Sequence, residues 1–225
     1  MQYYPLLMNM TGARCLVVGA GEVGCRKLAD LLTSELAEAV VLDIAAPSAV
    51  LTGLLHDARV RFEQRPFEES DVRGKTLVFA ATGDHAMNSR VLAACETAGV
   101  LCNCADDPER SGFIVPSRIC EGRVTVSLST QGASPALARR MREEMTPRVR
   151  NVYAPLAELL ARLRPGVLAL GWETRRNTEL FRHIVHSDLG EALAAGDTRR
   201  CTALLQELLP DVLRDRITEL LYGLV

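Results

Sequence analysis

The sequence predicts an α/β fold in which an open, doubly wound parallel sheet is followed by a small hairpin segment and an α-helical C-terminal domain. Up to about Asp106, short apolar runs alternate with segments of helical composition. The pattern then changes to two adjacent strand-like runs. From Asn151 onward the chain is leucine-rich with helical spacing and shows no convincing strand. We therefore expect domains at residues 1–111, 112–148 and 149–225.

Five strands with intervening helices are expected in the first domain. The strand-like runs are Cys15–Val18, Ala39–Asp43, Val60–Glu63, Thr76–Ala81 and Val100–Cys104, and the helical segments are Glu22–Thr33, Ser48–Asp57 and about Asp84–Ala98. Gly99 is suited to end the last of these helices, because glycine adopts the left-handed cap conformation without strain. Strands joined through helices pair in parallel with right-handed crossovers, which predicts an open sheet.

The second and third domains follow different patterns. Gly112–Val115 and Arg123–Ser129 are strand-like and are joined through Glu121-Gly122, which predicts a hairpin. Ser134-Pro135 supplies an N-cap and a first-turn proline for a helix to about Met145, which Pro147 is expected to end. The helical remainder is expected to break at Pro165-Gly166, Gly196 and Pro210.

The composition excludes several classes of protein. The 225 residues are 48% hydrophobic and 24% charged with a net charge of −2, which is typical of a globular protein and lacks the basic excess of a general nucleic-acid or membrane-surface binder. No apolar run approaches the roughly 20 residues that span a bilayer, and the first residues make a poor signal peptide. The seven cysteines form no regular framework, which favours reduced thiols. We therefore expect a cytoplasmic protein.

A glycine motif marks the junction between the first strand and helix. Gly19-Ala-Gly21-Glu-Val-Gly24 fits G-x-G-x-x-G, whose glycines make a tight turn and admit a pyrophosphate to the helix N-terminus. Asp43 ends the second strand, where a carboxylate can accept both ribose hydroxyls and would repel a 2′-phosphate. The next arginine is as distant as Arg59, so NAD is predicted rather than NADP. The alternatives are a glycine turn that binds no dinucleotide and a surface acid at residue 43.

Two acids follow the fifth strand. Asp106 and Asp107 lie at the carboxyl edge, where open parallel sheets hold ligands. A carboxylate there could take a proton beside a carbon that gives its hydride to a nicotinamide. Alternatively, Asp106-Asp107-Pro108 forms only a turn. The residues by themselves favour the turn and leave both interpretations open.

A second group of polar residues surrounds the expected start of the helix at Ser134. Ser129, Thr130, Ser134 and Arg139 could form a cradle for carboxylates or phosphates, or a serine cap followed by a solvated basic helix face. His183-x-x-His186 could share one helical face, but no third ligand is apparent nearby. An ordinary histidine pair is the simpler interpretation, so no metal site is predicted.

Taken together, the motifs resemble the precorrin-2 dehydrogenase family, which belongs to sirohaem biosynthesis and also occurs as the N-terminal part of sirohaem synthases. The resemblance covers roughly residues 2–145. It rests on Tyr4–Met10, Cys15–Lys27, Pro66-Phe67, Ala80–Thr82 with Asn88, Asn103–Asp107, Phe113–Ser117 and Ser129–Arg139. It implies a Rossmann-type NAD-binding domain and NAD-dependent oxidation of precorrin-2 to sirohydrochlorin. It also implies a homodimer whose middle segment forms the subunit contact.

The resemblance also implies roles for single residues. Asp106 takes the position of the family's essential aspartate, and Ser129 that of a serine near the tetrapyrrole pocket. The expected cofactor-binding residues are Gly19, Gly21, Glu22, Val23, Gly24, Asp43, Ala81 and Thr82. The expected substrate-binding residues are Asn103, Ser129, Thr130, Ser134 and Arg139.

Two alternatives to a dedicated dehydrogenase stay open. Some family members also insert iron or cobalt into sirohydrochlorin, and Asp106 does not decide between the two types. A regulatory module that senses NAD is the other alternative, although the 9 arginines and 10 acids from Asn151 onward offer phosphate little net attraction. Gly83 is a departure from the family pattern, in which an acid often follows the Ala-Ala-Thr stretch. No methyltransferase domain follows in the sequence. We therefore favour the dehydrogenase alone.

Overall fold

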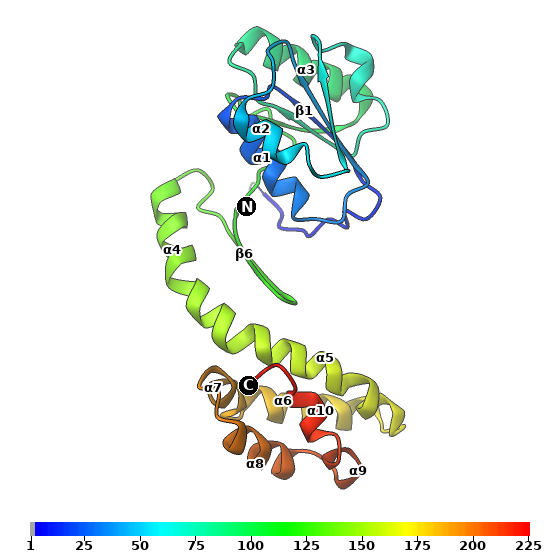
Figure 1. Ribbon diagram of the computed structural model, residues 1–225, viewed down its shortest axis with the longest axis vertical. Coiled ribbons are helices and arrows are strands. Elements are labelled where there is room, and N and C mark those ends of the chain that lie inside the picture. The colour runs from blue at the N-terminus through cyan, green and yellow to red at the C-terminus, as the bar shows by residue number, and fades with distance from the viewer. Residues whose placement is uncertain (1–2) are drawn as a thin grey trace. The chain divides into compact units, whose positions relative to one another are not determined.

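The computed structural model describes residues 3–225, which form two compact units that divide between Val115 and Pro116 (Figure 1). The first unit holds a five-stranded parallel sheet of order β3-β2-β1-β4-β5. Its strands are β1 (Arg14–Val18), β2 (Glu38–Asp43), β3 (Val60–Gln64), β4 (Leu77–Ala80) and β5 (Leu101–Cys104). The predicted doubly wound parallel sheet is confirmed.

The sheet is buried on both faces, as the apolar strands require. The helices are α1 (Glu22–Leu32), α2 (Ala49–Leu54) and α3 (His85–Ala98), with a short 3₁₀ helix, η1 (Glu69–Val72). Side chains alternate along β1: Val17 packs with Leu28 of α1, whereas Leu16 packs in a separate core with Leu92 of α3. Gly99 ends α3 with a φ of 66°, as predicted.

The register of the sheet places the loops that follow its strands along one edge. Val18 pairs with Leu42 on one side and Ala80 on the other, and Ala80 pairs in turn with Cys104. The loops after β1, β2, β4 and β5 therefore begin at neighbouring positions. The strand order reverses between β1 and β4, where open α/β sheets hold ligands.

The second unit contains an antiparallel hairpin followed by helices. Strands β6 (Ser117–Glu121) and β7 (Val124–Leu128) turn at Gly122, whose φ is 54°. The helical elements are α4 (Pro135–Arg148), the π-helical η2 (Val149–Tyr153), α5 (Ala154–Ala169), α6 (Thr174–His186), α7 (Leu189–Ala194), α8 (Thr198–Leu208), α9 (Asp211–Arg214) and α10 (Ile217–Leu221). Leucines of α5 pack with residues of α6, α8 and α10 in one core. Within residues 3–225, no helix combines the length and apolar character needed to cross a membrane.

The predicted strand at Gly112–Val115 is wrong, because β6 begins only at Ser117. The segment is held in another way: the Gly112 N–H donates to the Cys102 carbonyl, and the Asn103 side chain donates to the Phe113 carbonyl. Phe113 packs edge-on against Phe79 with ring centroids 5.4 Å apart. The apolar run therefore reflects packing against the first unit's core and not strand pairing.

The predicted helix end at Pro147 and the break at Pro165-Gly166 are also wrong. Pro147 lies inside α4, which continues through η2 into α5, and Pro165 lies inside α5 (Figure 1). Proline removes one helical N–H donor. After Pro147 the hydrogen bonding resumes at once, because the Val149 N–H donates to the carbonyls of Met145 and Thr146. The breaks at Gly196 and Pro210 are confirmed, since they separate α7, α8 and α9.

Candidate functional site: a dinucleotide cavity and an aspartate network

Two glycines of the motif are required by the packing of the loop between β1 and α1. Gly19 has a φ of 100°, and a Cβ there would lie 2.5 Å from the Ala81 carbonyl oxygen. A Cβ at Gly24 would lie 1.9 Å from the Gly19 carbonyl oxygen. Larger side chains at either position would collide with backbone, so both glycines let α1 approach the sheet edge closely.

Gly21 has a different role, because it faces open space. It is the N-cap of α1 with a φ of −69°, and no described atom lies within 4 Å of the position that a Cβ would take. The first N–H groups of a helix have no intrahelical partner, and a glycine N-cap has no side chain to satisfy them. Helix α1 thus begins, at Glu22 and Val23, with donors suited to a phosphate and with room for it.

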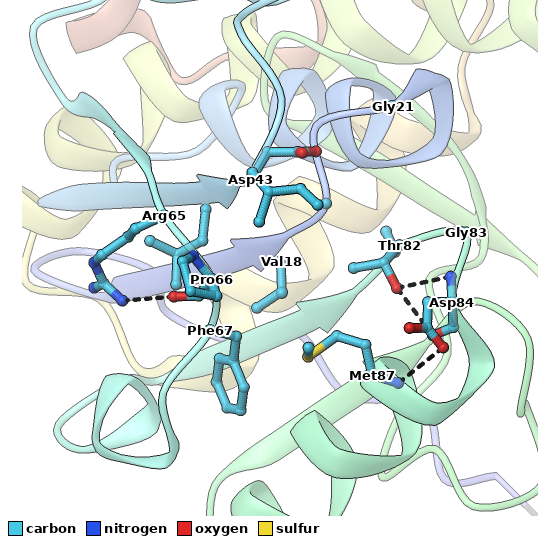
Figure 2. A pocket seen from close by; sticks show the side chains of 14 residues that line it. Val18, Gly21, Asp43, Arg65, Pro66, Phe67, Thr82, Gly83, Asp84 and Met87 are labelled. Atoms are coloured by element: carbon cyan, nitrogen blue, oxygen red, sulfur yellow. Dashed lines mark hydrogen bonds between the residues drawn. The ribbon is translucent and has the colours of Figure 1, made fainter.

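A cavity of about 430 Å³ opens beside this helix start (Figure 2). It is lined by Val18, Gly19, Gly21, Leu42, Asp43, Ile44, Arg65, Pro66, Phe67, Ala81, Thr82, Gly83, Asp84 and Met87. Five predicted cofactor residues are thus brought together: Gly19, Gly21, Asp43, Ala81 and Thr82. The loop after β3, Arg65 to Phe67, also lines the cavity, but sequence reasoning used Pro66-Phe67 only for the resemblance and assigned this loop no ligand contact.

Asp43, the last residue of β2, accepts a hydrogen bond from the glycine loop. Its Oδ2 accepts the Ala20 N–H at 2.6 Å, and its Oδ1 accepts the Ala45 N–H at 2.8 Å. Each carboxylate oxygen can accept a further hydrogen bond, and the side chain also lines the cavity. The residue is therefore more than a surface acid.

Arg65, the arginine that lines the cavity, is already engaged. Arg65 donates to both oxygens of Asp71 and to Glu63, and these carboxylates raise the pKa of its guanidinium above the usual value. Arg59 donates to Asp57 and to the Leu32 and Ser34 carbonyls near the end of α1. Binding a 2′-phosphate through Arg65 would require breaking its contacts with Asp71 and Glu63, whereas Arg59 lies at the other end of β3 from the cavity.

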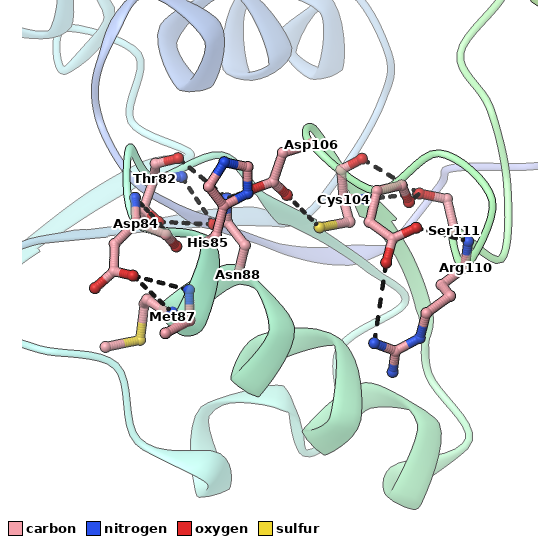
Figure 3. A network of polar contacts seen from close by, with 11 residues as sticks. Thr82, Asp84, His85, Met87, Asn88, Cys104, Asp106, Arg110 and Ser111 are labelled. Carbon is pink, nitrogen blue, oxygen red and sulfur yellow. Dashed lines mark hydrogen bonds and ion pairs between the residues drawn. The ribbon is translucent and has the colours of Figure 1, made fainter.

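A second polar cluster surrounds Asp106, just after β5 (Figure 3). Its Oδ2 lies 2.9 Å from the Asn88 amide nitrogen and 2.5 Å from Nδ1 of His85, and its Oδ1 lies 2.9 Å from the Cys104 sulfur. Hydrogen bonds, the strongest from Cys104 and another from Asn88, hold the pKa of Asp106 below its usual value. Burial and the neighbouring carboxylate raise the pKa of the Cys104 thiol to about 11, so that it stays protonated and can donate.

The turn expected at these acids is formed by Asp107. Its Oδ1 accepts the Arg110 N–H at 3.1 Å, and its carbonyl accepts the Ser111 hydroxyl. Asp106, by contrast, faces α3 and its side chain is 24% exposed. The two neighbouring acids therefore have different environments: Asp106 contacts Cys104, Asn88 and His85, whereas Asp107 pairs with Arg110.

Asn88 connects this network to the dinucleotide cavity. Its side chain is buried, its Oδ1 accepts from the N–H and hydroxyl of Thr82, and its Nδ2 donates to the Thr82 carbonyl and to Asp106. Thr82 lines the cavity, so one amide group separates the cavity wall from Asp106. Sequence reasoning left His85 without a role and named Asn88 only through the resemblance.

The predicted substrate-binding residues make mostly local contacts. Asn103, in the first unit, is buried and donates to the Phe113 carbonyl. The others belong to the second unit: Ser129 accepts the Gln131 N–H, Thr130 bonds the Ser134 backbone, Ser134 caps α4 at Leu137, and Arg139 pairs with Glu143. Their substrate contacts stay a prediction. Within residues 3–225 no group of three or more His, Cys, Asp and Glu side chains is arranged to hold a metal ion.

Residues 6–117 match a family of domains described as "Putative NAD(P)-binding". The matched segment coincides with the sheet and the cavity described above. A nicotinamide dinucleotide is the class of cofactor for which the glycine turn, the open helix start and the cavity provide a fitting site.

Two curated relatives extend the similarity beyond the NAD(P)-binding domain. A siroheme synthase of Methylococcus capsulatus is 33% identical over 207 residues, which cover 92% of this chain and 43% of that protein. A siroheme synthase of Nitrosococcus oceani is 32% identical and is covered to 44%, with 93% of this chain matched. The chain thus spans less than half the length of these relatives. The resemblance that the motifs predicted is confirmed.

The fold has a close counterpart among solved structures. The structure described as "SirC, precorrin-2 dehydrogenase" superposes with a TM-score of 0.73, covering 92% of this chain and 98% of that chain at 22% identity. The predicted sequence of a parallel sheet, a small antiparallel sheet and C-terminal helices is confirmed by this similarity.

Proposed function

We propose that this chain is an NAD-dependent dehydrogenase that oxidises precorrin-2 to sirohydrochlorin in sirohaem biosynthesis in the cytoplasm. The observation that carries the proposal is the connection of Asp106 to the dinucleotide cavity through Asn88 and Thr82. An ionised carboxylate network beside a hydride-acceptor site suits the removal of a hydride and a proton from one substrate. The relatives named siroheme synthase and the similarity to a precorrin-2 dehydrogenase support the choice of substrate.

The proposed cofactor is NAD, in preference to NADP. Asp43 lines the cavity, where its charge would repel a 2′-phosphate, and the guanidiniums of Arg59 and Arg65 are bound by other groups. A bound nicotinamide would supply the hydride acceptor. Isothermal titration calorimetry should give at least a tenfold lower Kd for NAD than for NADP, and Asp43→Ala should raise the Kd for NAD. Equal affinities for the two dinucleotides would refute this choice.

The activity is tested by anaerobic incubation of the purified chain with precorrin-2 and NAD. Reduced nicotinamide and sirohydrochlorin should appear in equal amounts, because two electrons leave each substrate molecule. Asp106→Ala should lower the rate by about 10² or more while the Kd for NAD stays within about threefold. Asp107→Ala is the matched control and should keep most of the rate, since that carboxylate serves the adjacent turn. Absence of both products with the wild-type chain would refute the proposed function.

The same preparation tests for a second activity. Sirohydrochlorin is supplied with Fe(II) or Co(II) in the absence of NAD, and metal insertion is followed spectroscopically. Insertion at the protein-free rate is the result expected for a dedicated dehydrogenase. Insertion well above that rate would make the protein bifunctional and would replace the narrower proposal.

We also propose that the chain acts as a homodimer whose contact includes α4. None of the described α4 residues is buried within this chain, and Leu137, Met141 and Met145 form an exposed apolar row at helical spacing. A second copy of the same helix would remove this row from water. Analytical ultracentrifugation should show a dimer, and Leu137→Asp combined with Met141→Asp should give a folded monomer. A wild-type monomer at micromolar concentration would refute the proposal.

A further inference from the structure

His85 directly follows Asp84, which lines the dinucleotide cavity, although His85 is not itself a lining residue. It is the first residue of α3, directly after the N-cap Asp84, and its side chain is 85% exposed. Asp84, the preceding residue, and Met87, two residues further along α3, both line the cavity. The imidazole is therefore accessible to a ligand and belongs to a residue next in sequence to the cavity wall.

The ring of His85 contacts Asp106. Its Nδ1 lies 2.5 Å from Oδ2 of Asp106 (Figure 3). When Nδ1 carries the proton and donates it to this carboxylate, the lone pair of a neutral imidazole is on Nε2. The contact thus selects the form of histidine in which the outer nitrogen is a base, and it supplies a negative charge beside the ring.

Asp106 itself is poorly suited to take a proton. Cys104 donates to one of its oxygens, and Asn88 and His85 contact the other. These donors stabilise the ionised carboxylate and hold its pKa below the usual value. A carboxylate stabilised in this way is a weak base, but it is well placed to orient an imidazole and to stabilise its protonated form.

We propose that His85 is the group that accepts the proton of the substrate, and that Asp106 acts through it as a positioning residue. The proposal rests on the dehydrogenase activity proposed above. One C–H bond of precorrin-2 breaks and its electron pair leaves as hydride, which reduces NAD⁺ to NADH. A second C–H or N–H bond loses its proton to Nε2 of His85, and its electron pair stays in the macrocycle as part of the new double bond. The protonated ring then returns its proton to water.

The first test measures turnover of single and double variants. His85→Ala and His85→Gln should lower kcat by about 10² to 10⁴, the usual contribution of a general base, with the Kd for NAD within about threefold of wild type. Added imidazole should restore part of the rate of His85→Ala. Adding Asp106→Asn to His85→Gln should slow the enzyme by no more than about threefold further, because residues that act as a unit are not additive. His56→Ala is the control, since His56 precedes β3 at the opposite edge of the sheet.

The second test reads accessibility independently of turnover. Diethyl pyrocarbonate should modify His85 in the free protein, and saturating substrate should slow that modification at least tenfold, as located by peptide mass spectrometry. Thermal unfolding of each variant checks that it is folded. If folded His85→Ala turns over near the wild-type rate, or if substrate leaves the modification of His85 unchanged, the proposal is overturned and Asp106 becomes the proton acceptor. If the wild-type chain shows no turnover, the proposed function fails and this assignment fails with it.

Discussion

Two glycines of the same turn, three residues apart, should respond to alanine in opposite ways. At Gly24 the new Cβ would meet the Gly19 carbonyl oxygen at 1.9 Å, where 3.4 Å or more is ordinary contact. Backbone must therefore move by roughly 1.5 Å, and such overpacking costs about 3 kcal/mol at the upper end of its usual range. The higher helix propensity of alanine offsets about 1 kcal/mol of this loss in the free energy of unfolding. The net loss is about 2 kcal/mol, and at about 4 °C per kcal/mol the Tm of the first unit should fall by about 8 °C.

Gly21→Ala is the matched variant. The φ of Gly21 is −69°, and no described atom lies within 4 Å of the new Cβ. The cost to folding is limited to the weaker N-cap preference of alanine, about 1 kcal/mol or less. The same methyl group would occupy the space proposed for the pyrophosphate, so the Kd for NAD should rise tenfold or more, which corresponds to about 1.4 kcal/mol.

Thermal unfolding followed by circular dichroism, together with calorimetric titration of NAD, separates the two effects. Gly24→Ala should lose stability without ligand present, whereas Gly21→Ala should lose mainly the stabilisation that NAD provides. The reasoning would be refuted by a Gly24→Ala protein that melts with the wild type, or by a Gly21→Ala protein that binds NAD with wild-type affinity.

Three further predictions concern the network, the acid stability and the thiols. Asn88→Ala removes the buried partner of Thr82 and Asp106, so urea denaturation should show a loss of about 1–3 kcal/mol in the free energy of unfolding; an unchanged value would contradict the proposed role of the amide. Hydrogen bonds from Arg59 lower the pKa of Asp57 from 3.8 to about 2, so its stabilisation is present above pH 3.8 and is lost as the pH falls through about 2. Asp57→Asn should therefore lose stability at neutral pH and show a flatter decline of Tm in acid, and parallel Tm profiles would count against it. At pH 8, Ellman's reagent should react rapidly with the exposed Cys120 and slowly with the six buried thiols. Cys15 is one of the buried thiols, and burial raises its pKa to about 11. A Cys120→Ser protein that keeps a fast-reacting thiol would disprove this prediction.

The fold of the first unit could be predicted because its signals are local. Strands β1, β2 and β4 are short apolar runs, and Gly99 marks the end of α3 by its own conformational freedom. The errors arise where a local rule meets tertiary packing. Pro147 ends an isolated helix, but here the next turn, η2, buries Val149 and Val152, and that packing keeps the helix continuous. Apolar composition likewise could not distinguish a paired strand from the unpaired Gly112–Val115 segment.

Only part of the candidate site could be predicted from the sequence. The motif spacing alone predicts the positions of three residues at the end of the sheet: Gly19, Gly24 and Asp43. His85 and Asp106 are 21 positions apart, on elements that only the β4–β5 register brings together, and a lone histidine carries no periodic signal. Sequence reasoning therefore identified the acid but not its partner.

Few side chains could replace Asn88 and keep its hydrogen bonds. Such a side chain must receive two hydrogens from Thr82 on one atom and deliver hydrogens to the Thr82 carbonyl and Asp106 from another, inside a space that excludes water. An ionised aspartate has no hydrogen to donate, and leucine can neither donate nor accept a hydrogen bond. Glutamine has both groups, but its side chain is one methylene longer. If codon 88 were fully randomised and the variants were screened for the proposed dehydrogenase activity, nearly all active variants should encode asparagine.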